Sequence, residues 1–200
     1  MKRLILFLTV AAILFSCKKE ENPNPAPIPT VYPPSVYVPI YQPGDTSMGA
    51  AYGKKLTANW KAESFCIVQS YFDTNFVAMG LYTYNNFGEQ RESIGFSFIP
   101  RFGGAAKYLL KANTGSVVAQ GYISPSYAIW TSDGDVLQDA YVIDSTAFDN
   151  HFTVKSIDMV NKRIECTFTA TFKILEPRTS PANPKTVKFS EGRAWAVIRD

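Results

Sequence analysis

The chain has 200 residues, of which 46% are hydrophobic, and its formal net charge is +3 at pH 7. Two positive charges, Lys2 and Arg3, stand at the N-terminus, so residues 17–200 carry a formal charge of only +1. A protein that binds nucleic acid through its phosphates needs a strongly basic face, so this near-neutral composition argues against nucleic acid, and we predict no such partner. The length fits one folded domain of about 150 residues behind an N-terminal extension.

The first seventeen residues predict where the protein resides. A basic pair, Lys2 and Arg3, precedes an almost wholly apolar run that ends at Ser16 and Cys17. The run is too short to cross the roughly 30 Å hydrocarbon core as a helix, so residues 1–16 are predicted to be a signal peptide. A cysteine directly after a small residue at the end of such a run is the diacylglycerol acceptor of bacterial lipoproteins. We therefore predict that Cys17 is lipidated and holds the protein on a membrane.

The residues after Cys17 refine this prediction. Lys18 stands where an aspartate would signal retention in the inner membrane, so an outer-membrane lipoprotein is expected. The triplet 19–21, Lys-Glu-Glu, resembles the lysine-plus-acids export signal of Bacteroidetes surface lipoproteins, which would place the protein on the cell surface. The alternative is a solvated, charged spacer with no signalling role.

A proline-rich segment separates the lipidation site from the rest of the chain. Residues 22–45 contain eight of the thirteen prolines. Proline fixes its own φ and pushes the preceding residue to extended geometry, so this segment is predicted to be a semi-rigid tether. A proline-rich ligand for a partner is the alternative. The predicted organisation is therefore a signal peptide over 1–16, a lipidated linker over 17–48 and a folded domain over 49–200.

The folded domain is predicted to be all-β. Its expected strands span residues 56–72, 76–84, 93–99, 107–111, 117–124, 127–131, 140–144, 152–159, 163–175 and 186–198. Turn-forming residues separate them, as in Asn85-Asn86-Phe87-Gly88 and Ser132-Asp133-Gly134-Asp135. No segment sustains a 3.6-residue period between helix caps. Short strands between polar turns are typical of a single antiparallel β-sandwich, whose last two strands form a long hairpin.

Two long runs of strict alternation predict which side chains face the core. The inward sets are Leu56, Ala58, Trp60, Ala62, Cys66 and Val68 in the first run, and Ile164, Cys166, Phe168, Ala170, Phe172 and Ile174 in the second. Cys66 and Cys166 are thus both expected to point inward, in an oxidising compartment where disulfides persist. Either the two form a disulfide, or they are buried free thiols that behave as small hydrophobes.

The C-terminal third resembles a known kind of protein. Residues 152–158, 161–168 and 187–193 are similar to a recurrent ending of small Bacteroidetes lipoproteins of unknown function. That ending has a strand "itI...D", a turn with asparagine followed by "isGtF", and a closing strand "v.ftdG.F". Cys166 replaces the glycine of this pattern, and Ala194 replaces its last aromatic residue. The resemblance implies the fold and the location, and it supplies no catalytic residue.

Candidate catalytic and metal-binding residues are few. His151 is the single histidine, and Asp149 lies two residues before it, but no Gly-x-Ser-x-Gly motif accompanies them. Asp133, Asp135 and Asp139 offer carboxylates to calcium, yet an Asp-Gly hairpin turn explains the first two more simply. We therefore predict no metal, no cofactor and no enzymatic activity.

Aromatic side chains are the stronger indication of function. Tyr82 and Tyr84 take the outward parity of their strand, and Tyr122, Tyr127 and Trp130 surround a short loop over 124–126. Exposed aromatics on a rigid sheet stack sugars or bind protein partners, although tyrosine is also common in strands. We predict a non-enzymatic binding or structural accessory that recognises a glycan, a peptide or an envelope protein, chiefly through Tyr82, Tyr84 and Trp130. The alternative is an extracytoplasmic hydrolase acting on glycan or peptide.

Overall fold

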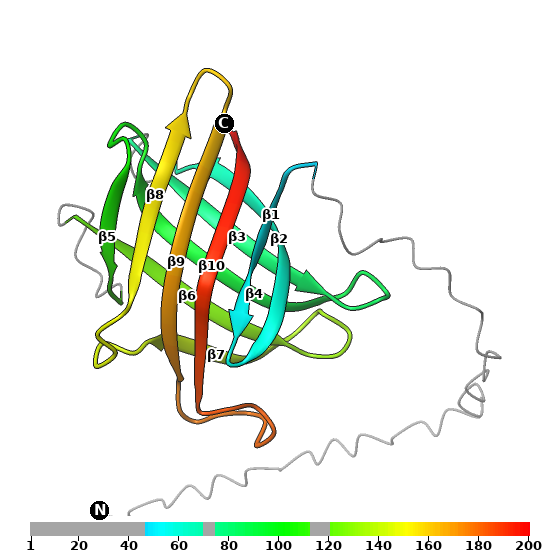
Figure 1. The fold of residues 1–200 in the computed structure, drawn as a ribbon. Helices are drawn as coiled ribbons and strands as arrows, with labels where there is room; N and C mark the ends of the chain where they lie inside the picture. The colour runs from blue at the N-terminus through cyan, green and yellow to red at the C-terminus, as the bar shows by residue number, and fades with distance from the viewer. Residues whose placement is uncertain (1–46, 70–74, 113–120) are drawn as a thin grey trace, which may run out of the picture. The chain divides into compact units, whose positions relative to one another are not determined.

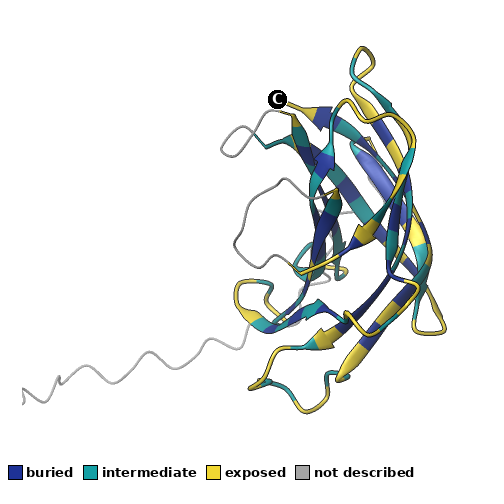
Figure 2. Ribbon diagram, turned by 90° about the vertical axis from the view of Figure 1, so that its left-hand side faces the viewer, coloured by how far each residue is buried: buried dark blue, intermediate teal, exposed yellow. Residues whose placement is uncertain are grey.

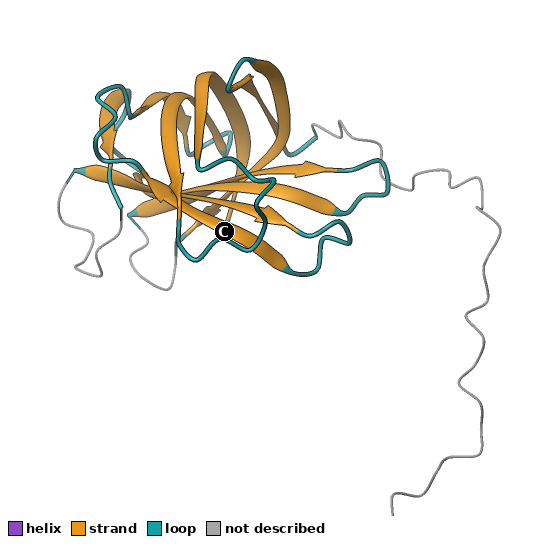
Figure 3. Cartoon of the chain, turned by 90° about the horizontal axis from the view of Figure 1, so that it is seen from below, coloured by secondary structure: helices purple, strands orange, loops and turns teal. Residues whose placement is uncertain are grey.

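The computed structural model describes residues 47–69, 75–112 and 121–200. The predicted signal peptide, Cys17 and all of the predicted linker except residues 47–48 lie outside these residues. Ten strands and no helix occur in the described part (Figure 3), so no helix there is apolar and long enough to cross a bilayer. The strands are β1 Gly49–Lys55, β2 Ala58–Val68, β3 Phe76–Tyr84, β4 Gln90–Pro100, β5 Ala106–Leu110, β6 Tyr122–Trp130, β7 Leu137–Ile143, β8 His151–Asp158, β9 Arg163–Ile174 and β10 Thr186–Arg199.

The strands belong to one sheet, which is folded into two layers. Its order is β1-β10-β2-β3-β4-β6-β5-β8-β9-β7, with further pairings β1–β2, β10–β9 and β6–β7. In Figure 1, β8, β9 and β10 lie in front, and β3, β4 and β6 run obliquely across behind them. Nearly all pairings are antiparallel, and the two exceptions, β10–β2 and β5–β6, join two residue pairs each. The predicted all-β sandwich is confirmed.

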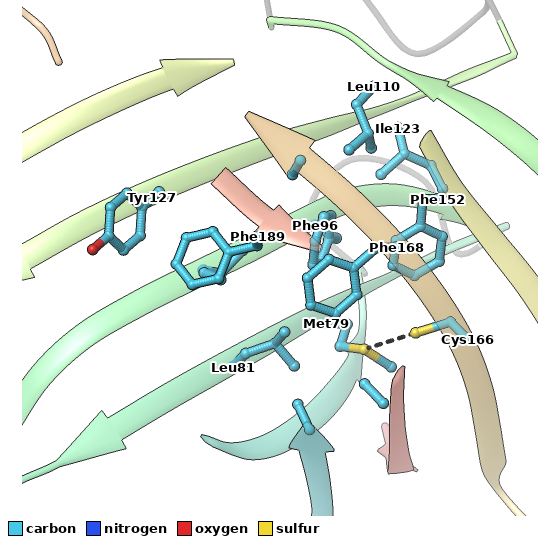
Figure 4. Packing of buried hydrophobic residues seen from close by; sticks show 14 of the residues in the cluster. Met79, Leu81, Phe96, Leu110, Ile123, Tyr127, Phe152, Cys166, Phe168 and Phe189 are labelled. Atoms are coloured by element: carbon cyan, nitrogen blue, oxygen red, sulfur yellow. Dashed lines mark hydrogen bonds between the residues drawn. The ribbon is translucent and has the colours of Figure 1, made fainter. Parts of the chain in front are cut away.

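Aromatic side chains join the two layers across the core. The Phe96 ring on β4 lies 4.8 Å from the Phe152 ring on β8 and 5.1 Å from the Phe168 ring on β9 (Figure 4). Buried and more exposed residues alternate along the strands (Figure 2), because a strand directs successive side chains to opposite faces. Phe residues of this kind dominate core energetics, since each buries a large apolar area.

The two predicted inward sets are largely confirmed. Trp60, Ala62, Cys66, Ile164, Cys166, Phe168, Ala170 and Phe172 are all buried. Leu56 and Ala58 were wrongly placed in the core, and both are exposed. The reason is that a separate strand, β1, precedes them, and Leu56 sits in the tight β1–β2 turn with a φ of 55°.

The predicted loop over residues 124–126 is instead the middle of a continuous strand, β6. Pro125 pairs with Phe96 of β4 on one side. On its other side, β6 pairs with β5 up to Ile123 and with β7 only from Tyr127 onward. Pro125 has no N–H to donate. It lies in the gap between the part of β6 that pairs with β5 and the part that pairs with β7, so no hydrogen bond is lost on that side of the strand.

Cys66 and Cys166 are free, buried thiols in the structure, so the disulfide alternative is not formed. Their strands, β2 and β9, both pair with β10 rather than with each other. Cys166 donates its S–H to Met79 Sδ at 3.6 Å (Figure 4), and Met79 is the register partner of Cys66 on β3. Both sulfurs therefore pack around one methionine, as small hydrophobic groups do.

The predicted long hairpin is present as β9 and β10, with a bulge between Phe189 and Gly192. A Cβ placed on Gly192 would lie 2.7 Å from the Phe168 ring, so only glycine admits the ring at this position. Phe168 and Gly192 are register partners, so this contact fixes how the two strands pack at the bulge.

Candidate functional site

A hollow of about 370 Å³ opens beside β2 and β3, and it contains two of the predicted aromatic residues. We name it the Tyr82 pocket. It is lined by Ser47, Met48, Glu63, Ser64, Phe65, Ile67, Tyr82, Tyr84 and Arg199. Its volume lies within the roughly 300–1,000 Å³ that is usual for small-molecule sites. A mostly apolar wall with a few polar groups is the composition expected of such a site.

The strand register sets the positions of the aromatic residues. Val77, Met79 and Leu81 are fully buried on the inner face of β3, so Tyr82 and Tyr84 point outward. On the neighbouring β2, Phe65 takes the same outward parity, and its ring stacks on Tyr82 with centroids 5.0 Å apart and planes 12° apart. Since stacked rings restrict each other's rotamers, this wall of the pocket is preorganised.

Gly80 provides the space in which the Tyr82 ring lies. A Cβ on Gly80 would fall 2.5 Å from Tyr82 Cε2 and 3.1 Å from the Phe65 ring. Both rings therefore cover the backbone of β3 at this glycine, which explains why Gly80 is buried although it has outward parity. Gly80 is a positioning residue for the aromatic wall.

Charged groups complete the pocket. Glu63 is the register partner of Tyr82, and Arg199 reaches the site because β10 pairs with β2 at Ile67. Burial raises the pKa of Tyr84, and the nearby Glu63 carboxylate and Tyr82 raise it further. Burial also raises the pKa of Tyr82. Both phenols are neutral at physiological pH, as tyrosines ordinarily are, and they face a carboxylate acceptor and a guanidinium donor.

Trp130, the third predicted ligand-binding aromatic, lies on the same outward face but is not among the described residues that line the Tyr82 pocket. Tyr82 pairs with Ser93 on β4, and Ser93 pairs with Ala128 on β6. The Trp130 indole N–H donates to Ser93 Oγ at 3.2 Å. One serine therefore separates Trp130 from Tyr82 across the strands.

Tyr127, which sequence reasoning grouped with the exposed aromatics, is instead in the core, with 1% of its surface exposed. Its hydroxyl donates to Glu92 Oε1 at 2.9 Å. Burial, together with the charge and hydrogen bond of Glu92, raises the pKa of Tyr127. Pro125 predicts a loop before Tyr127, whereas in the continuous strand β6 Tyr127 shares the inward parity of the buried Ile129.

A polar cluster around Glu92 was missed. Its carboxylate pairs with Lys55 on β1 and accepts the Trp60 indole N–H at 3.3 Å and the Tyr127 hydroxyl. Glu92 shares parity with the buried Ile94 of β4, so it points inward. An acid on the inward parity of a strand is the signal that would have found it. The expected strand begins at residue 93, three positions after β4 does, and so leaves Glu92 outside it.

The remaining candidates serve the local structure. His151 is hydrogen-bonded from Nδ1 to the carbonyl oxygen of Asp149 at 2.7 Å. Asp133 accepts the Thr131 hydroxyl within a hairpin turn. Asp139 is buried and accepts the N–H of Thr179 at 2.6 Å. No group of three or more His, Cys, Asp or Glu side chains in the described part of the chain is placed to hold a metal ion.

The chain was compared with protein-family models, with curated proteins and with solved structures, and none of them matched.

Proposed function

We propose that this chain is a lipid-anchored glycan-binding module of the bacterial envelope, and that the Tyr82 pocket holds a sugar ring. The observation that carries the proposal is the pocket itself: an aromatic wall, stacked and fixed, faces polar side chains of opposite charge. The C–H bonds of a pyranose pack against aromatic faces, while its hydroxyls exchange hydrogen bonds with carboxylate and guanidinium groups.

Each polar residue has a defined role in this proposal. Glu63 accepts hydrogen bonds from sugar hydroxyls, and Arg199 donates to the ring or hydroxyl oxygens. The Tyr84 hydroxyl, which is neutral at physiological pH as tyrosine hydroxyls ordinarily are, donates or accepts as the sugar requires. The near-neutral charge of residues 17–200 fits an uncharged ligand in this pocket.

The pocket composition favours binding over hydrolysis. Glycosidases use two carboxylates about 5–9.5 Å apart. Glu63 is the one carboxylate among the described residues that line the Tyr82 pocket. The lipidation predicted at Cys17 and the reach that the proline-rich segment would supply support a tethered receptor as the role we propose.

The test is a glycan array followed by titration calorimetry with the best ligand. The variant Tyr82→Ala/Tyr84→Ala should lose binding by about 2 kcal/mol or more, as central aromatic contacts do. Phe148→Ala is the control, because Phe148 is a fully exposed aromatic residue away from the pocket lining. Equal affinity of the double variant and the control would reject the pocket as the binding site.

A further inference from the structure

A second hollow lies on the outer face of β1, β10, β9 and β8, and it shares no residue with the Tyr82 pocket. Its volume is about 250 Å³. The polar and aromatic side chains that line it are Tyr52, Lys155, Glu165, Thr167, Arg193 and Trp195. The register brings them together, because Arg193 pairs with Tyr52 on one side and with Thr167 on the other, while Trp195 pairs with Glu165.

The charges in this hollow do not balance. Glu165 is neutralised by Arg163, whose guanidinium bonds its carboxylate at 3.0 Å and also lies 4.2 Å from the Trp195 ring centroid. Arg193 and Lys155 have no ion-pair partner in the described part of the chain. Other lysines of the domain do pair with acids, for example Lys188 with Asp149. Two cations thus face a hollow whose single described carboxylate is already bonded.

We propose that this hollow is a second ligand site, which binds an acidic saccharide bearing a carboxylate. Arg193 presents a planar fork that matches a carboxylate in two hydrogen bonds, and Lys155 adds a point charge. Trp195 and Tyr52, whose rings also contact Arg163 and Lys61, give the sugar apolar contact through the parts that line the hollow, and the Thr167 hydroxyl offers a donor and an acceptor. This site does not depend on the function proposed for the Tyr82 pocket.

The number and placement of the charges favour this ligand over larger anionic surfaces. Nucleic acid is held by about 6–10 phosphate contacts, and each basic residue near an anionic membrane adds only about 1 kcal/mol. Two cations line the hollow and Lys61, over the Tyr52 ring, is a third beside it, which is still too few for either surface. They suffice for one carboxylate group when aromatic rings bind the rest of the sugar.

The test uses the full-length chain and three soluble probes: trigalacturonate, its methyl ester, and glycerol phosphate, which reproduces a phospholipid headgroup. Calorimetry at low salt should show binding of trigalacturonate and at least about tenfold weaker binding of the methyl ester, since charge-assisted hydrogen bonds are lost. Arg193→Gln and Lys155→Gln should each weaken trigalacturonate binding about tenfold. Lys188→Gln removes the same charge from a paired lysine and should change the affinity less than about twofold.

Several outcomes would overturn the proposal. Equal binding of acid and ester would show that the cations do not recognise the ligand. An equal loss in Lys188→Gln would show that only overall charge matters. Glycerol phosphate binding as tightly as trigalacturonate would assign the hollow to phosphate groups. The proposal would also be rejected if Arg193→Gln and Lys155→Gln bound trigalacturonate as tightly as the wild type does, or if the wild type did not bind it. Thermal melting of each variant confirms that the fold is intact before affinities are compared.

Discussion

Tyr82 and Phe65 stack on the outer side of the sheet with ring centroids 5.0 Å apart, and both rings cover the backbone at Gly80. This arrangement turns an ordinary feature of β-sheets, an outward tyrosine, into one wall of a pocket. The wall exists because β3 has a glycine where its neighbour rings need space. The aromatic wall of the pocket therefore depends on a residue that carries no side chain.

Gly80→Ala should disrupt this wall. The new methyl group would overlap the Tyr82 ring, which must move away from Phe65, so we expect an altered near-UV circular dichroism spectrum and about tenfold weaker ligand binding. Gly95→Ala is the matched control, since Gly95 pairs directly with Gly80 and its Cβ would meet only the rotatable Ser126 Oγ at 2.8 Å. Identical spectra and affinities for the two variants would show that the glycine does not position the wall.

Glu92→Gln should destabilise the domain. The substitution removes the charge that neutralises Lys55, while Trp60 and Tyr127 still direct donors at the same position. Breaking a buried pair costs about 3–5 kcal/mol, and since Lys55 keeps some solvent access we expect about 2–3 kcal/mol by urea unfolding. Asp200→Asn, which breaks the exposed pair with Lys162, should cost less than about 1 kcal/mol. Similar losses in both variants would contradict a structural role for the Glu92 cluster.

Both core cysteines should be countable as thiols. Burial raises the pKa of Cys66 to about 12, and burial also raises the pKa of Cys166, so neither forms much of the reactive thiolate at pH 8. A thiol reagent should therefore label neither residue rapidly in the native protein. After denaturation without reductant it should label two thiols per chain, beside a lipidated Cys17. Finding no thiol after denaturation would mean that Cys66 and Cys166 are bonded in the cell.

Asp139 should contribute stability that depends on pH. Burial alone would raise the pKa of Asp139, but hydrogen bonds from Asn183 and from the N–H groups of Thr179 and Ser180 outweigh it and lower the pKa. A lowered pKa gives stability that is present above the unfolded value of about 3.9 and is lost as the pH falls through the folded value.

The corresponding experiment is urea unfolding of Asp139→Asn from pH 7 down to pH 2. The variant should be about 1–2 kcal/mol less stable than the wild type at pH 7, and the difference should shrink below pH 4. Asp135→Asn, in an exposed turn, should follow the wild type throughout. A difference that stays constant with pH would mean that the carboxylate charge is not what binds the loop over 175–185.

Much of the fold could be predicted from alternation alone. The β9 and β10 hairpin and the inward set around Phe168 follow from a period of two, because buried strands sort apolar side chains to one face. β1 was missed because its residues 49–55 are small or polar and show little alternation. Pro125 predicts a loop, yet it lies inside β6, because a proline is tolerated within a strand where a neighbouring strand ends, and that depends on the tertiary arrangement.

The candidate site was predictable in part. The outward parity of Tyr82 and Tyr84 is a local property of β3, and it placed them correctly on the surface. Arg199 joins these tyrosines in the pocket because β10 pairs with β2. The two strands lie more than a hundred residues apart in the sequence, and no local pattern encodes such a pairing. The same is true of the Glu92 cluster, whose members come from four strands.

The central claim, that the Tyr82 pocket binds a sugar, is tested most directly by an NMR titration of the protein with the best neutral ligand from the glycan array. We predict that the largest amide shifts fall on residues 47–48, 63–67, 82–84 and 199, and that they are lost in Tyr82→Ala/Tyr84→Ala. Shifts centred on other strands, or shifts that persist unchanged in the double variant, would contradict the account.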